Sequence, residues 1–411
     1  MSTAERTGLD PKRLARIDEH LKRRYIEPRK IAGALTLVAR RGELAYLSPV
    51  GLMDLEREKP MREDTIFRIY SMTKPITSVA IMMLWEEGHW QLTDPVDRFI
   101  PQWRNLGVYQ AGMHPNYLTT PVERRMQMRD LLTHQSGLTY GFMYRTSVDA
   151  AYRETGVGGA VPASGEAARP GTLADMVERL AGIPLEFSPG TQWNYSVSTD
   201  VLAHIVEVIS GQRFDQFLRE RIFEPLGMVD TGFSVPADKV DRFAANYERR
   251  PDKRLVLVDD PATSSYLQQP IFLSGGGGLV STVRDYGRFC QMLLNGGELD
   301  GHRILGRKTI ELMTMNHLPD GKDLTELSVA AYTETASEGV GFGLGFAVTL
   351  DPTLTGGGSI GEYYWGGAAS TIFWIDPEED LIVIFLTQLM PSGTFNFRGQ
   401  LKQFVCSAFA D

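Results

Sequence analysis

Two residues in the first quarter of the chain have the types and spacing for nucleophilic chemistry. Ser71 and Lys74 form an S-x-x-K motif, and Pro75 follows directly. A helix is expected to start here, because proline is favoured in a first helical turn, where its missing N–H leaves no hydrogen bond unmade. Residues i and i+3 share one helix face, which brings the lysine amine towards the serine hydroxyl. The motif therefore indicates a serine nucleophile with an adjacent base.

Lys74 can act as a base only in a particular environment. A lysine accepts a proton near neutral pH only if its pKa is lowered by burial or by neighbouring cations. The apolar residues around the motif favour burial. An S-x-x-K sequence also arises by chance about once or twice in a chain of this length, without any function. Further segments are needed to tell a catalytic motif from a coincidence.

Four later segments supply that support. MRDLLTHQSGL (128–138), FSPGTQWNYSVSTDVLAHIVEVISG (187–211), SGGGGLVSTVRDYGRF (274–289) and EYYWGGAAST (362–371) follow the motif in order. With it they resemble the serine β-lactamase and penicillin-binding-protein superfamily, over about residues 30 to 390. The resemblance is closest to the esterase branch related to class C β-lactamases, the family VIII esterases.

The resemblance implies roles for particular residues. Ser71 matches the acylated serine, Lys74 the S-x-x-K lysine, and Tyr195 the tyrosine of the Y-x-N motif. A phenol beside a lysine ammonium loses its proton more readily, so Tyr195 is expected to exchange protons with the serine and with the leaving group. The N–H groups of Ser71 and Ala368 are expected to form the oxyanion hole, which stabilises the charge that develops in acyl transfer.

Two departures from the superfamily pattern concern the substrate. Trp365 stands where the superfamily has the lysine of K-T-G, and Val197 stands where it has the asparagine of Y-x-N. A lysine would match the carboxylate of a β-lactam or a peptide, whereas an indole presents an apolar wall and one N–H donor. Neutral acyl esters are therefore the expected substrates, and weak β-lactam hydrolysis remains open. The other residues expected to contact substrate are Gly366, Gly367, Gln135, Tyr140, Phe142 and Tyr144.

A second serine competes for the role of nucleophile. Ser359 lies in a G-x-S-x-G sequence, which in α/β-hydrolases sits between a strand and a helix, with the catalytic histidine later in the chain. Here the segment resembles a glycine loop entering a strand, and every histidine precedes it, so Ser359 is rejected. The histidines are His20, His89, His114, His134, His204, His302 and His317.

Two further features have structural explanations. His134 ends a predicted helix, where a histidine usually caps the helix or bonds to backbone carbonyls. The run Gly275 to Gly278 lacks the Lys-Ser/Thr pair of a phosphate-binding loop, so close backbone packing beside the site is expected.

The periodicity of the chain predicts the elements that position these residues. An amphipathic helix is expected over 9–24, a β-hairpin around Arg41-Gly42, and helical segments without strands over 75–230, with a surface loop at 156–171. Strands are expected at 341–350, 363–375 and 381–390, before a closing helix from Asn396 to Ala408. The predicted class is α+β, a β-lactamase/transpeptidase-like fold with an antiparallel sheet flanked by helices and a mostly helical domain. Residues 1–88 and 240–411 are assigned to the first part and 89–239 to the second, with the active site in the cleft between them.

The composition of the chain limits its possible partners, location and cofactors. The chain has 43% apolar and 23% charged residues and a net charge of −9 without a basic block, which argues against nucleic acid as a partner. The polar first residues lack the apolar run of a secretory signal, and no stretch is long enough to span a bilayer, so a cytoplasmic protein without a membrane partner is expected. Neither cysteine has metal-ligand or redox spacing. No metal or cofactor is required, and the oligomeric state stays open.

The sequence thus predicts a serine carboxylesterase for small-molecule, short-chain acyl esters. The alternatives of the same fold are a β-lactamase, a D-amino-acid peptidase and an acyltransferase. A non-catalytic binding protein is the alternative from another class.

Overall fold

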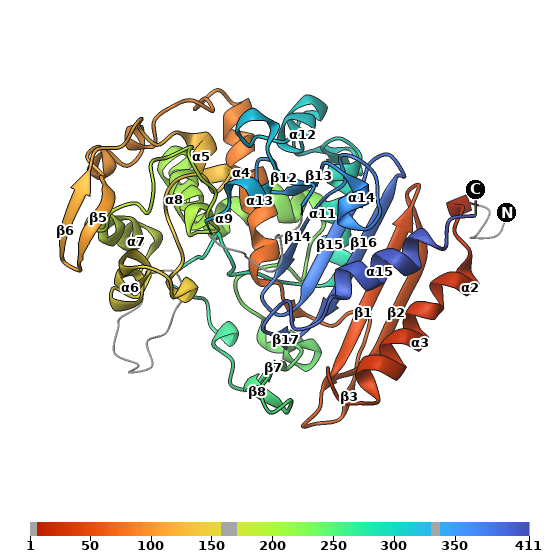
Figure 1. Ribbon diagram of the computed structural model, residues 1–411. Helices are drawn as coiled ribbons and strands as arrows, with labels where there is room; N and C mark the ends of the chain where they lie inside the picture. The colour runs from red at the N-terminus through yellow and green to blue at the C-terminus, as the bar shows by residue number, and fades with distance from the viewer. Residues whose placement is uncertain (1–5, 158–170, 330–337, 411) are drawn as a thin grey trace.

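An eight-stranded antiparallel sheet is the centre of the molecule, in a computed structural model that describes residues 6–157, 171–329 and 338–410. N-terminal strands lie beside C-terminal strands in it, which Figure 1 shows as red arrows next to blue ones. This confirms the predicted fold class. In spatial order the strands are β12 (Val340–Phe342), β13 (Ala347–Thr349), β14 (Tyr363–Gly367), β15 (Thr371–Asp376), β16 (Leu381–Thr387), β1 (Gly33–Arg40), β2 (Glu43–Asp54) and β3 (Lys59–Pro60).

The first hairpin forms where the sequence predicted it. Arg41 and Gly42 have φ values of 56° and 71°, the left-handed turn that joins strands with a right-handed twist. Strand β1 then pairs with β16, so the two ends of the chain share one sheet. Alternating side chains of β16 face opposite sides of the sheet, where Ile384 lies near α11 (Val283–Leu294) and Phe385 packs on Phe397 of α15 (Phe397–Cys406).

The helices near the two ends of the chain pack together on one face of the sheet, the face that α15 covers. The predicted opening helix is observed as α2 (Pro11–Leu14) and α3 (Arg16–Leu21), and a helical turn continues it to Ile26. The side chain of Asp10 accepts the N–H of Lys12, which explains why the helix begins there. In the closing helix the N-cap Asn396 accepts the N–H of Gly399 in the same way.

The central helix α4 (Thr73–Glu86) is buried along nearly its whole length, and α8 (Ser198–Ser210) packs against it. Helices α5 (Met128–Leu132) and α7 (Leu173–Leu180) pack on α8 in turn. In Figure 1, helices α5, α7 and α8 lie to the left of the sheet, and α4 lies between them and the sheet. The other α-helices of the described residues are α6 (Ser147–Glu154), α9 (Phe214–Leu218), α10 (Glu224–Leu226), α12 (Arg307–Met313), α13 (Leu324–Leu327) and α14 (Pro352–Thr355).

The prediction of a strand-free middle was wrong. Strands β5 (Val108–Met113) and β6 (Asn116–Thr120) form a hairpin whose side chains are mostly exposed, so it lacks the apolar alternation that signals a half-buried strand. The single strand predicted at 341–350 is instead the hairpin of β12 and β13, and the one predicted at 363–375 is the hairpin of β14 and β15, in which residues 368–370 form the turn. Most of the loop predicted at 156–171 lies outside the described residues. The other short strands are β4 (Phe67–Arg68), β7 (Asn246–Arg249), β8 (Leu255–Asp259), β9 (Val280–Ser281), β10 (Glu298–Leu299), β11 (His302–Arg303) and β17 (Leu389–Met390).

The division into residues 1–88 with 240–411 and residues 89–239 stays a prediction. In the described part of the chain, no helix has both the length and the apolar character that crossing a membrane requires.

Candidate active site

The candidate nucleophile sits on a short turn held from both sides. Strand β4 pairs with β9, the N–H of Ile69 donates to Leu279, and the 3-10 turn Tyr70–Met72 then carries Ser71 into α4. Tyr70 has a φ of 41°, a left-handed conformation that non-glycine residues rarely adopt. Its hydroxyl accepts a hydrogen bond from Asn246 Nδ2 at 3.0 Å. The surrounding contacts thus hold a strained backbone directly before the serine.

Three predicted residues meet at this turn. Lys74 Nζ lies 3.1 Å from Ser71 Oγ, and the Tyr195 hydroxyl lies 2.6 Å from the same oxygen. The exposed fraction is 9% for Ser71, 2% for Lys74 and 1% for Tyr195, so the cluster is largely withdrawn from water. Lys74 Nζ also lies 4.5 Å from the centre of the Tyr195 ring and 5.3 Å from that of Tyr140. A buried serine between an amine and a phenol is an arrangement suited to proton transfer from the nucleophile.

The glycine run packs tightly beside this cluster, as predicted. A Cβ on Gly275 would lie 2.6 Å from Ala203 Cβ, and one on Gly276 would lie 2.6 Å from Asp200 Oδ2. The carbonyl oxygen of Gly276 accepts a hydrogen bond from Lys74 Nζ at 2.6 Å. Sequence reasoning missed this acceptor, although four consecutive glycines near a motif signal a close backbone approach.

The end of β14 lies against the nucleophile turn. A Cβ on Gly367 would lie 2.4 Å from the carbonyl oxygen of Ile69, so only glycine fits there without a shift. Ala368 follows in the turn after β14, next to the segment that carries Ser71. This position suits the predicted oxyanion-hole role of the Ala368 N–H, which stays a prediction.

Two of the three predicted pocket aromatics lie beside the cluster. The Tyr140 and Phe142 rings stack with centroids 4.7 Å apart, and Tyr140 is 5.1 Å from the Tyr195 ring. Phe142 is 44% exposed, so one side of this stack is apolar and open to solvent, and its contact with substrate stays a prediction. Tyr144 is 72% exposed, and the Arg153 guanidinium lies 4.2 Å from its ring centre. The structure therefore directs Tyr144 to Arg153 rather than into the stack.

The remaining predicted substrate contacts lie deeper. Trp365 is 1% exposed, with its ring 5.5 Å from that of Tyr195, and its Nε1 has no hydrogen-bond partner among the described residues. Val197 is fully buried, and the Gln135 side chain donates to Thr133. The Trp365 ring therefore packs against the Tyr195 ring. Substrate contacts of Trp365, Gly366, Val197 and Gln135 stay predictions.

His134 ends α5 with its backbone, as expected: its φ is 57°, its N–H lies 3.5 Å from Leu131 O, and the N–H of Gln135 donates to Asp130 O at 2.8 Å. Within the part of the chain that the structure describes, its ring bonds to a side chain and not to a backbone carbonyl. Its Nδ1 lies 3.2 Å from Ser196 Oγ, and its ring packs 5.0 Å from that of Tyr195. Burial, and secondarily the charge of Lys74, lowers the pKa of His134 well below its usual value. The imidazole is therefore uncharged at neutral pH. The backbone of His134 thus caps the helix while its ring packs in the core.

Ser359 lies between α14 and β14, so a helix precedes it and a strand follows. This is the reverse of the order around the nucleophile of α/β-hydrolases. The structure thus agrees with its rejection.

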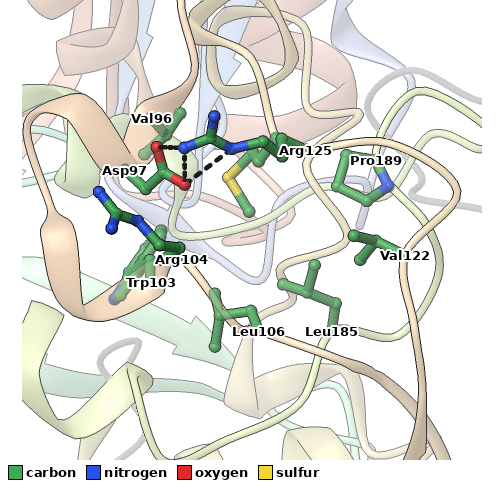
Figure 2. Close-up of a pocket in the computed structure, with 10 residues that line it drawn as sticks. Val96, Asp97, Trp103, Arg104, Leu106, Val122, Arg125, Leu185 and Pro189 are labelled. Atoms are coloured by element: carbon green, nitrogen blue, oxygen red, sulfur yellow. Dashed lines mark hydrogen bonds and ion pairs between the residues drawn. The ribbon is translucent and has the colours of Figure 1, made fainter.

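A separate small surface hollow contains none of the clustered residues. Figure 2 shows apolar side chains around the Asp97–Arg125 ion pair, in which Arg125 Nε donates to Asp97 at 2.9 Å. Its lining comprises Val96, Asp97, Trp103, Arg104, Leu106, Val122, Arg125, Met126, Leu185 and Pro189. Over the described ranges, no group of three or more histidine, cysteine or acidic side chains is placed to hold a metal ion.

Comparisons with known proteins cover nearly the whole chain. A family model described as Beta-lactamase matches residues 18–404. An uncharacterized protein of Mycobacterium tuberculosis is 37% identical over 88% of this chain and 86% of its own length. Esterase EstB of Burkholderia gladioli is 31% identical over 90% of this chain and 88% of its own. The structure of EstCE1, a hydrolase with promiscuous acyltransferase activity, superposes with a TM-score of 0.78 at 25% identity, over 98% of this chain and 99% of that one.

Proposed function

The chain belongs to the beta-lactamase family, as its motifs predicted, and is a serine hydrolase or acyltransferase of that fold. We propose that it is a carboxylesterase, which cleaves short-chain acyl esters through an acyl-enzyme on Ser71. The observation that carries the proposal is the convergence of Lys74 Nζ and the Tyr195 hydroxyl on Ser71 Oγ, at 3.1 and 2.6 Å.

The proposed reaction has two steps. The Ser71 oxygen attacks the ester carbonyl while its proton passes to the Lys74–Tyr195 pair, and the N–H groups of Ser71 and Ala368 stabilise the oxyanion. Collapse breaks the bond to the alcohol, which leaves with the proton held by the pair. Water then attacks the acyl-serine, the pair takes a proton from that water and returns it to Ser71, and the carboxylic acid leaves.

Two features support an ester as the substrate. The K-T-G lysine is replaced by Trp365, so the residue that would match a β-lactam or peptide carboxylate is missing from that position. The exposed edge of the Tyr140–Phe142 stack is apolar and suits a short acyl chain. The 31% identity to esterase EstB points in the same direction.

Rates on p-nitrophenyl butyrate and on a chromogenic cephalosporin, measured side by side, test the substrate. We expect a strong preference for the ester, and a preference for the cephalosporin would refute the proposed substrate. An acyl-chain-length series would then define the acyl pocket.

Labelling with a fluorophosphonate, read by mass spectrometry, tests the nucleophile separately. The adduct is expected on Ser71 and is expected to vanish in Ser71→Ala. An unlabelled wild-type protein would favour the non-catalytic alternative.

An acyltransferase is the second candidate, favoured by the likeness to EstCE1. The same acyl-enzyme would be attacked by an alcohol in place of water. Adding a primary alcohol to the ester assay and measuring new ester against free acid distinguishes the two, because a transferase would yield mainly new ester.

A further inference from the structure

A buried carboxylate behind the catalytic lysine has no role in the mechanism above. Asp200 is the third residue of α8 and is 3% exposed. Its Oδ1 accepts two hydrogen bonds, from the N–H of Gly276 at 2.9 Å and from Ser274 Oγ at 2.6 Å. A buried carboxylate is costly unless it is well paired, so these two donors tie the glycine segment firmly to α8.

The same glycine contacts the lysine on its other side. The carbonyl oxygen of Gly276 takes the hydrogen bond of Lys74 Nζ at 2.6 Å, shorter than the 3.1 Å from that nitrogen to Ser71 Oγ. The position of the lysine amine therefore depends on the position of the Gly276 backbone. Because Gly276 has no side chain to anchor it, Asp200 and Ser274 supply the anchor.

We propose that Asp200 is a positioning residue that holds the Gly276 carbonyl on Lys74 and so aligns the lysine with Ser71. The inference rests on the proposed function, in which Lys74 takes part in the proton transfer. Asp200 acts through Gly276 and touches no reacting atom.

Charge adds to this geometry. Among the described residues, the ionisable groups near Lys74 include the phenols of Tyr140 and Tyr195, the imidazole of His134 and the carboxyl of Asp200. Burial raises the pKa of Asp200, and the charge of Lys74 and the two donors oppose that rise. An ionised Asp200 favours the protonated form of the lysine, so removing its charge favours the free amine.

The test compares Asp200→Asn and Asp200→Ala with the wild type in the pH profile of kcat/KM on p-nitrophenyl butyrate. Asparagine keeps an acceptor oxygen but loses the charge, so the acidic limb is expected to move to lower pH by about one unit. Alanine loses acceptor and charge, so kcat is expected to fall about 10- to 100-fold with KM little changed, because the amine is misplaced. Ser274→Ala removes one of the two hydrogen bonds and is expected to give a smaller loss of kcat.

Asp285 provides a matched control. It is also the third residue of a helix, α11, is 1% exposed, and accepts one backbone N–H, from Asp230 at 2.7 Å, and one hydroxyl, from Thr231 at 2.9 Å. Asp285→Asn is expected to lower the unfolding temperature without moving the pH profile.

Two results would overturn the inference: wild-type rates and profiles in both Asp200 variants, or an equal shift of the acidic limb in Asp285→Asn. Failure of the proposed function gives a different signature, because the wild type would then show neither ester turnover nor fluorophosphonate labelling of Ser71.

Discussion

Replacing Gly367 with alanine tests whether the contact between β14 and the nucleophile turn positions the serine. The new Cβ would lie 2.4 Å from the carbonyl oxygen of Ile69 and 2.4 Å from Thr371 Oγ1. The threonine side chain can rotate away, but the carbonyl belongs to the backbone two residues before Ser71. That backbone is fixed by hydrogen bonds from Ile69 N to Leu279 O at 3.1 Å and from Met72 N to Ile69 O at 3.0 Å.

The size of the effect follows from the displacement. Ordinary contacts of a Cβ begin at 3.4 Å, so the carbonyl and the strand must separate by about 1 Å. A misplacement of about 1 Å in a catalytic group costs about 100-fold in rate, which equals about 2.7 kcal/mol of transition-state stabilisation. Forcing a methyl group into a packed site also lowers the free energy of unfolding by about 1–3 kcal/mol.

The assay is kcat/KM on p-nitrophenyl butyrate together with urea unfolding. Gly287→Ala is the control, because its Cβ would meet only Ile384 Cδ1 and Leu37 Cδ1, both at 3.8 Å, within helix α11. That variant should keep wild-type kcat/KM and gain about 0.5–1 kcal/mol of stability. A Gly367→Ala enzyme with wild-type kcat/KM would refute the argument that this contact aligns the serine.

Other variants test the remaining contacts. Ser71→Ala and Lys74→Ala should each remove nearly all ester turnover, because the groups act as a unit. Tyr195→Phe should lose most of kcat. Full activity of any of the three variants on p-nitrophenyl butyrate would contradict the mechanism. Lys402→Met should cost about 3–5 kcal/mol in urea unfolding, because its Nζ lies 2.6 Å from a carboxylate oxygen of Glu362 and both side chains are buried. Pairing it with Glu362→Gln should recover part of that loss, and no recovery would mean that packing rather than charge is responsible.

The pH dependence of stability tests the buried imidazole. The pKa of His134 is lowered on folding, so below its unfolded value of about 6.5 the unfolded chain binds the proton more readily, and stability is lost as pH falls. His134→Asn should remove up to about 1.4 kcal/mol of that loss per pH unit below pH 6.5, measured by urea unfolding at pH 7 and pH 5.5. Equal losses in the variant and the wild type would contradict the lowered pKa.

Much of the fold was predictable because its signals are local. The hairpin at Arg41-Gly42, the helix that begins near Pro75 and the strands close to both ends of the chain all carry periodic apolar patterns or turn residues. The β5–β6 hairpin could not be found this way, since its exposed residues have no apolar alternation.

The residues of the candidate site also differ in whether local spacing could predict them. Ser71 and Lys74 could be paired from their spacing alone, because residues three apart on a helix are neighbours in any fold. Tyr195 was assigned only through the family resemblance, since no local rule brings it to a serine 124 positions away. The carbonyl of Gly276, 202 positions from Lys74, and the carboxylate of Asp200 were not predicted at all.

The sequence by itself therefore determined the candidate nucleophile, its adjacent amine and the periodic elements that carry them. Only the tertiary structure decided which distant groups surround that pair: the tyrosine at 2.6 Å from the serine, the glycine carbonyl on the lysine, and the uncharged histidine ring packed on that tyrosine. The physical reason is that spacing along a helix or strand fixes neighbours within one element. Contacts between α4, α8, β14 and the glycine segment depend on how the whole core packs.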